Sequence, residues 1–110
     1  MKEVGFEREA EIFQALGHPV RLRLLSFLAE GPRCTCEIEP AFDIDQSTIS
    51  RHLITLKRAG ILSSYKEGVK VIYRVQDKRV LGLLRTVSEL IQDTMRQELE
   101  RQEAKAGGSR

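Results

Sequence analysis

The sequence predicts a mainly α-helical protein with one small β-hairpin. Through most of the chain, apolar residues recur at intervals of three or four, which is the period of an α-helix. Between residues 61 and 75 two short runs rich in β-branched residues flank a glycine, which is typical of a hairpin. A chain of 110 residues can bury one modest core. We therefore expect one domain, residues 1–105, and a flexible tail, residues 106–110.

Two helices are expected before residue 30, separated by a break at Gly17, His18 and Pro19. The first has its apolar residues at helical spacing and ends at Gly17. These residues are Phe6, Ala10, Phe13 and Leu16. The second runs over residues 20–29, with Pro19 in its first turn and Arg21 facing outward. We assign His18 a structural role in the break, where its ring can bond to the nearby backbone.

A short third helix and a longer fourth helix follow. The third is expected to begin near Thr35 or Cys36, with Thr35 as a plausible N-cap. Asp45 is placed to cap the fourth, which covers roughly residues 46–59 and ends before Gly60. Its inward face has apolar residues at i, i+4 and i+7. These residues are Ile49, Leu53 and Leu56.

The last third of the chain predicts a hairpin and a terminal helix. Strands are expected over residues 61–66 and 70–75, with a tight turn at Glu67 and Gly68. A helix then starts at Asp77 and has a long apolar stripe, which needs a partner surface. The stripe consists of Val80, Leu84, Val87, Ile91 and Met95. We therefore expect a homodimer held mainly by this helix.

This order of elements is that of a winged helix-turn-helix, in which the fourth helix would contact DNA. Small hydroxyl side chains allow close approach to a groove, and Arg or His side chains donate to base edges or phosphates. The expected DNA-binding residues are Gln46, Ser47, Thr48, Ser50, Arg51 and His52 of the helix and Lys66 and Lys70 of the hairpin. The alternative is a solvated polar helix face beside a basic hairpin.

The distribution of charge supports the DNA interpretation more than the net charge of +2 does. Residues 43–74 contain six Lys or Arg against three Asp or Glu, whereas residues 1–17 contain two against four. Positive charge is thus concentrated on the segment expected to meet phosphates, as electrostatic DNA binding requires.

Other classes of protein have little support. No apolar run approaches the roughly 20 residues of a membrane span, and no secretory signal opens the chain, so we expect a cytoplasmic protein without a membrane partner. An enzyme is not expected, because the chain has no CxxC motif, no glycine-rich phosphate loop and no βαβ pattern. Two cysteines separated by one residue, Cys34 and Cys36, favour ligand or redox chemistry over a structural bond.

Four motifs resemble the ArsR/SmtB family of small dimeric winged-helix repressors. They are residues 15–25 (ALGHPVRLRLL), 34–38 (CTCEI), 46–53 (QSTISRHL) and 56–62 (LKRAGIL). The resemblance implies a homodimer that binds a palindromic double-stranded DNA operator and represses transcription until an inducer binds. It also places His52 in the DNA-reading helix rather than among metal ligands.

In the arsenic-sensing members of this family, a Cys-x-Cys at the start of the third helix binds trivalent arsenic or antimony. Cys34 and Cys36 match that position, and thiolates are suitable soft ligands. Glu39 stands where the best-known site has a third cysteine. Within a regular helix, residues i and i+2 point about 200° apart, so chelation is expected to unwind the first turn. A thiol-redox switch, another thiophilic metal and no function are the alternatives.

Overall fold

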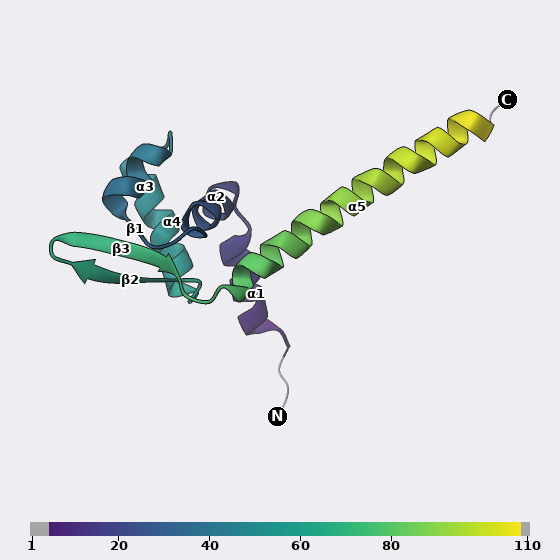
Figure 1. Ribbon diagram of the computed structural model, residues 1–110. Helices are drawn as coiled ribbons and strands as arrows, with labels where there is room; N and C mark the ends of the chain where they lie inside the picture. The colour runs from purple at the N-terminus through teal and green to yellow at the C-terminus, as the bar shows by residue number, and fades with distance from the viewer. Residues whose placement is uncertain (1–4, 109–110) are drawn as a thin grey trace. The chain divides into compact units, whose positions relative to one another are not determined.

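The computed structural model describes residues 5–108 and divides the chain into two compact units, residues 1–78 and residues 79–110 (Figure 1). The elements of the first unit are α1 (Glu7–Leu16), α2 (Pro19–Leu28), β1 (Arg33–Cys34), α3 (Thr35–Ala41), α4 (Gln46–Arg58), β2 (Leu62–Glu67) and β3 (Lys70–Val75). The second unit is the helix α5 (Arg79–Gly108). This order of elements in the described residues confirms the predicted fold, a mainly helical winged helix-turn-helix.

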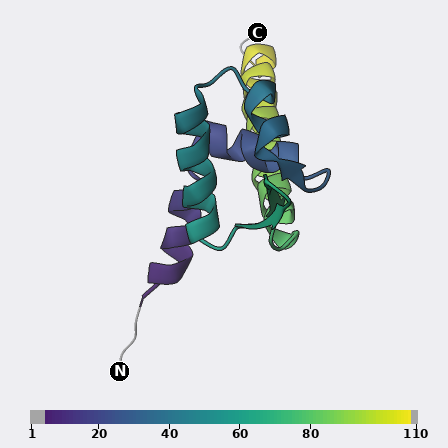
Figure 2. The ribbon, with the colours of Figure 1, turned by 90° about the vertical axis from the view of Figure 1, so that its left-hand side faces the viewer.

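The core of the first unit lies between its helices and its small sheet. α2 crosses α4 and is in contact with it (Figure 2). The predicted inward face of α4 is confirmed, because Ile49, Leu53 and Leu56 are all buried. The large side chains with almost no exposed surface are Leu24, Leu25, Leu28, Ile38, Ile49, Leu53, Leu56 and Leu62. Leucine and isoleucine thus fix the position of α4, which leaves its other face open.

The sheet has three antiparallel strands in the order β1–β3–β2, one strand more than the sequence predicted. β1 has only two residues, which are too few to show the alternating apolar and polar pattern that predicts a strand. The hairpin turn was predicted one residue too early. Glu67 pairs with Lys70, so the turn consists of Gly68 and Val69, and Gly68 adopts a φ of 64° that favours glycine.

α3 begins at Thr35, one of the two expected starts, but its N-cap is not the expected one. Its N-cap is Cys34 and not Thr35, which is already helical. Cys34 has the extended backbone of an N-cap residue because it also ends strand β1. The structural role of His18 is confirmed, since its Nδ1 accepts a hydrogen bond of 3.1 Å from the backbone N–H of Val20 at the start of α2.

The helix α5 begins two residues after the expected Asp77 and has 30 residues. It continues through residues 106–108, where a flexible tail was expected, and residues 109–110 lie outside the described part. Exposed apolar side chains follow its length: Val87, Leu90, Ile91, Met95 and Leu99. Within residues 5–108 we find no helix whose length and apolarity would allow it to cross a membrane.

Candidate DNA-binding surface and dithiol site

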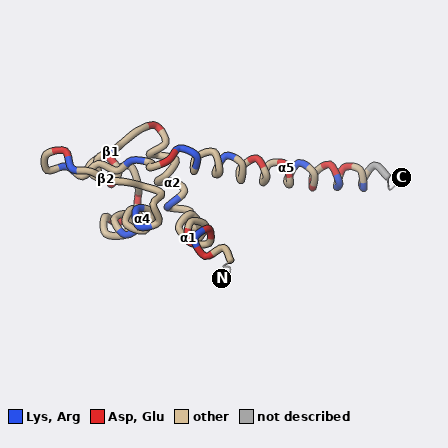
Figure 3. Tube along the Cα trace, turned by 90° about the horizontal axis from the view of Figure 1, so that it is seen from below, with Lys and Arg blue, Asp and Glu red and all other residues tan. Residues whose placement is uncertain are grey.

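The side of α4 opposite the core is polar and exposed. Four of its predicted DNA-binding residues are exposed: Gln46, Ser47, Ser50 and Arg51. The other two, Thr48 and His52, are half-buried. The hairpin residues Lys66 and Lys70 are exposed beside the turn. Basic residues therefore occur both on α4 and at the hairpin tip (Figure 3), which gives the first unit two elements able to contact phosphates.

The start of α4 is ordered by Asp45. Its carboxylate accepts hydrogen bonds from the Ser47 hydroxyl at 2.7 Å, from the Thr48 hydroxyl at 2.8 Å and from the Thr48 backbone N–H at 3.1 Å. These bonds, led by the one from Ser47, lower the pKa of Asp45 to about 2. A guanidinium N–H of Arg51 donates to the Thr48 hydroxyl at 3.2 Å. The predicted DNA-reading hydroxyls of Ser47 and Thr48 thus also fix the helix start.

His52 differs from the other predicted DNA-reading residues of α4 because its ring contacts α2 and the residue before it. His52 is half-buried, and its ring lies against that of His18, with 4.3 Å between ring centroids. Its Nδ1 accepts a hydrogen bond of 3.1 Å from Nε of Arg21. Arg21 was predicted to face outward, which is wrong, because its guanidinium also donates to the backbone carbonyls of Gln14 and Ala15. This arrangement ties α4 to α2 and to the end of α1.

The environment of His52 favours its neutral form. Burial is the main cause that lowers its pKa below the usual 6.5, and the nearby His18, Arg21 and Arg51 lower it further. A neutral ring is also what the geometry requires, since Nδ1 must carry a lone pair to accept from Arg21.

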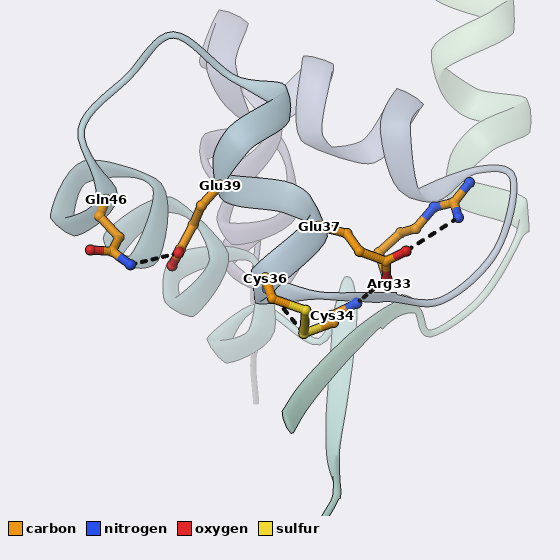
Figure 4. The surroundings of a disulfide bond; sticks show 6 residues. All are labelled: Arg33, Cys34, Cys36, Glu37, Glu39 and Gln46. Carbon is orange, nitrogen blue, oxygen red and sulfur yellow. Dashed lines mark hydrogen bonds and ion pairs between the residues drawn. A yellow bond between two sulfur atoms is a disulfide. The ribbon is translucent and has the colours of Figure 1, made fainter. Parts of the chain in front are cut away.

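Cys34 and Cys36 lie side by side, and their sulfur atoms are joined in a disulfide (Figure 4). Their Cα atoms are 5.0 Å apart, within the usual range for disulfides. The backbone N–H of Cys36 donates to Sγ of Cys34 at 3.0 Å. Because Cys34 precedes the helix, the premise that the two side chains diverge within a regular turn is wrong. The two sulfurs meet without any unwinding of α3.

A reciprocal pair of hydrogen bonds, a capping box, holds this helix start. The side chain of Cys34 accepts from the helix backbone, while Oε1 of Glu37 accepts from the backbone N–H of Cys34 at 2.9 Å. The other oxygen of Glu37 lies 3.9 Å from the guanidinium of Arg33. Glu37 was missed as a site residue, although its position three residues after the cap is the signal of a capping box.

Glu39 does not complete a ligand set with the cysteines. Its Oε1 accepts a hydrogen bond of 2.6 Å from the side-chain amide of Gln46, the first residue of α4 (Figure 4). The described part of the chain contains no group of three or more His, Cys, Asp or Glu side chains placed to hold a metal ion. The protein therefore offers two sulfur ligands, and Glu39 instead links α3 to α4.

A winged helix-turn-helix with an exposed polar helix and a basic hairpin is the architecture of DNA-binding transcription regulators. Residues 18–64 match the family described as bacterial regulatory protein, arsR family. The HTH-type transcriptional regulator MJ1325 of Methanocaldococcus jannaschii is 45% identical over 86 residues, which are 77% of this chain and 97% of that protein.

Two further comparisons also match regulators of this kind. The transcriptional repressor SmtB homolog of Synechocystis sp. is 33% identical over 88 residues, 80% of this chain and 67% of that protein. The homodimeric winged helix-turn-helix domain of Mb0332 from Mycobacterium bovis, a possible ArsR-family regulator, superposes with a TM-score of 0.74 at 28% identity and covers 82% of this chain and 83% of that chain. The chain belongs to the ArsR/SmtB family of winged helix-turn-helix transcriptional repressors.

The depressed pKa of His52 predicts a pH-dependent stability. Below pH 6.5, His52 is protonated in the unfolded chain, whereas in the folded protein it takes up a proton only at lower pH. The free energy of unfolding therefore falls as the pH drops from 6.5 toward the lower pKa of the folded state. One such group contributes at most about 1.4 kcal/mol per pH unit. His52→Gln keeps an acceptor for Arg21 but cannot titrate, so urea unfolding at pH 7.5 and 5.5 should show a smaller loss for this variant. Equal losses in both proteins would contradict the assignment.

Proposed function

We propose that this repressor binds a palindromic operator as a homodimer and releases it when trivalent arsenic or antimony binds the thiolates of Cys34 and Cys36. The observation that carries the proposal is the position of the two sulfurs. They lie together at the N-terminus of α3, at the point where this helix joins the sheet that contains the hairpin.

The donor set suits a soft, thiophilic inducer. Trivalent arsenic and antimony form stable bonds to thiolate sulfur, whereas carboxylates are hard ligands. Two adjacent sulfurs supply two such bonds from one short segment. With Glu39 bonded to Gln46 instead, the third position is left for a water molecule or a small-molecule thiol.

Two links connect the cysteines to the DNA-binding elements. Cys34 pairs with Ile72 of β3, two residues from Lys70 at the hairpin tip. At the other end of α3, Glu39 is bonded to Gln46 at the start of α4. In its reduced form, the side chain of Cys34 must serve both as helix cap and as ligand. A bound inducer would therefore compete with the geometry that holds both DNA-binding elements, which is the requirement for a coupling free energy between the two sites.

For the DNA contacts, we assign base reading to the exposed residues Ser50 and Arg51, with Gln46, Ser47 and Thr48 at the helix start. Lys66 and Lys70 of the hairpin would contact phosphates. His52 would act through its contacts with Arg21 and His18, by holding α4 against α2.

The first test separates these DNA-binding roles. Arg51→Ala should cost about 1–3 kcal/mol of discrimination at one base position, and Lys70→Ala should weaken all sequences alike and reduce the salt slope by about 1. Arg101→Ala removes the same charge from the far end of α5 and serves as the control. Fluorescence anisotropy with operator and scrambled DNA over a range of salt concentrations measures both quantities. Operator affinity that is unchanged in Arg51→Ala would exclude base reading by this residue.

The second test concerns the inducer. Cys34→Ser and Cys36→Ser keep a side chain of similar size, so the reduced variants should bind the operator with wild-type affinity. Each should need at least tenfold more arsenite for release, about 1.4 kcal/mol, because one thiolate cannot chelate. Thr35→Ser, which leaves both thiols in place, is the matched control. If both cysteine variants release the operator at the wild-type arsenite concentration, the inducer binds elsewhere.

Dimerisation through α5 follows from its exposed apolar residues, which one chain leaves uncovered. In a symmetric dimer the same stripe would be buried on both helices. Ile91→Asp should therefore give a monomer by light scattering and lose operator affinity, whereas Gln92→Asp, with the same charge on the adjacent exposed position, should remain dimeric. A dimeric Ile91→Asp would place the interface elsewhere.

A further inference from the structure

We infer that the Cys34–Cys36 pair is also a site of reversible oxidation by low-molecular-weight disulfides, and that its closure makes the repressor insensitive to arsenite without releasing the operator. This inference rests on the proposed function only for its arsenite readout. Its other elements rest on the disulfide, on the unequal exposure of the two cysteines and on the contacts that persist around them.

The two cysteines are not equivalent. Cys36 is exposed on the first turn of α3, whereas Cys34 is 4% exposed and lies between the strand and the helix. An oxidant in solution therefore reaches Cys36 first. The backbone N–H of Cys36 donates to Sγ of Cys34 at 3.0 Å and holds this sulfur beside its partner. Cys36 is thus placed to capture the oxidant and Cys34 to resolve the product.

The reaction proceeds by two thiol–disulfide exchanges. In the first, the thiolate of Cys36 attacks one sulfur of the small disulfide, breaks its S–S bond and releases one small thiolate, which takes up a proton. In the second, the thiolate of Cys34 attacks Sγ of Cys36 and displaces the other small thiolate. Two protein thiols lose two electrons and two protons, and the small disulfide is reduced to two thiols.

The closed pair leaves both links to the DNA-binding elements intact. With the disulfide present, Glu37 still accepts from the backbone of Cys34, and Cys34 still pairs with Ile72 of β3. The bond between Glu39 and Gln46 at the start of α4 is present as well. Oxidation occupies both sulfurs that arsenic would need, and the helix and the hairpin remain in place. The oxidised protein should therefore stay on DNA.

Intact mass measures the chemistry directly, with glutathione disulfide as the probe. Reduced wild type should lose two hydrogens and retain no glutathione. Cys34→Ser should accumulate a mixed disulfide at Cys36. Cys36→Ser should react at least about tenfold more slowly, because a buried thiol is poorly accessible. Equal rates in the two variants, or a wild type that retains glutathione, would overturn the assigned order.

Operator binding tests the consequence. Oxidised wild type should keep operator affinity within about threefold of the reduced protein, less than 1 kcal/mol, and should no longer respond to arsenite. Reduction with a phosphine, removed before arsenite is added, should restore the response. Release of the operator by glutathione disulfide alone would overturn the inference. A reduced protein that ignores arsenite would instead refute the proposed inducer, while the mass and affinity measurements still test the oxidation.

Discussion

The hydrogen-bonded junction at Cys34, between β1 and α3, is the constraint on which the geometry of the candidate dithiol site depends. At this residue the chain leaves a strand and enters a helix, so one side chain serves as the N-cap of α3 while its backbone pairs with β3. α3 has only seven residues, too few for a stable isolated helix, and it contains Pro40. Its position therefore depends on the capping box and on the fully buried Ile38. A ligand bound at the cap would thus act on an element with little stability of its own.

A second connection fixes the orientation of the DNA-reading helix. Arg21 donates to His52 and to two carbonyls at the end of α1, so one guanidinium joins three helices. Its ability to do so requires a neutral His52, which partial burial favours. His52, which the sequence analysis assigned to DNA binding, instead contacts Arg21 and His18, whereas Ser50 and Arg51 on the same helix are exposed.

Periodicity made most of the fold predictable, because burial repeats along each helix. The inward residues of α4, its cap at Asp45 and the hairpin strands all follow from local patterns. The strand β1 and the orientation of Arg21 did not, since both depend on partners far along the chain. Of the site, the pair of cysteines was visible in the sequence, but their meeting across a helix N-cap was not. Thr35 is the better cap by residue type, and pairing of Cys34 with Ile72 moves the helix start one residue earlier.

The position of the cap changes the mechanism that the sequence suggests. If both cysteines lay within the helix, an inducer would have to break backbone hydrogen bonds before it could bind, and that cost would be set against its affinity. With Cys34 outside the helix, both sulfurs are already together, and only the cap interaction of Cys34 must be exchanged. In the proposed mechanism, the coupling to DNA would pass through the pairing of Cys34 with β3 and the hydrogen bond between Glu39 and Gln46. Those contacts are present together with the disulfide. The two proposals therefore assign one pair of sulfurs different responses to a metalloid and to an oxidant.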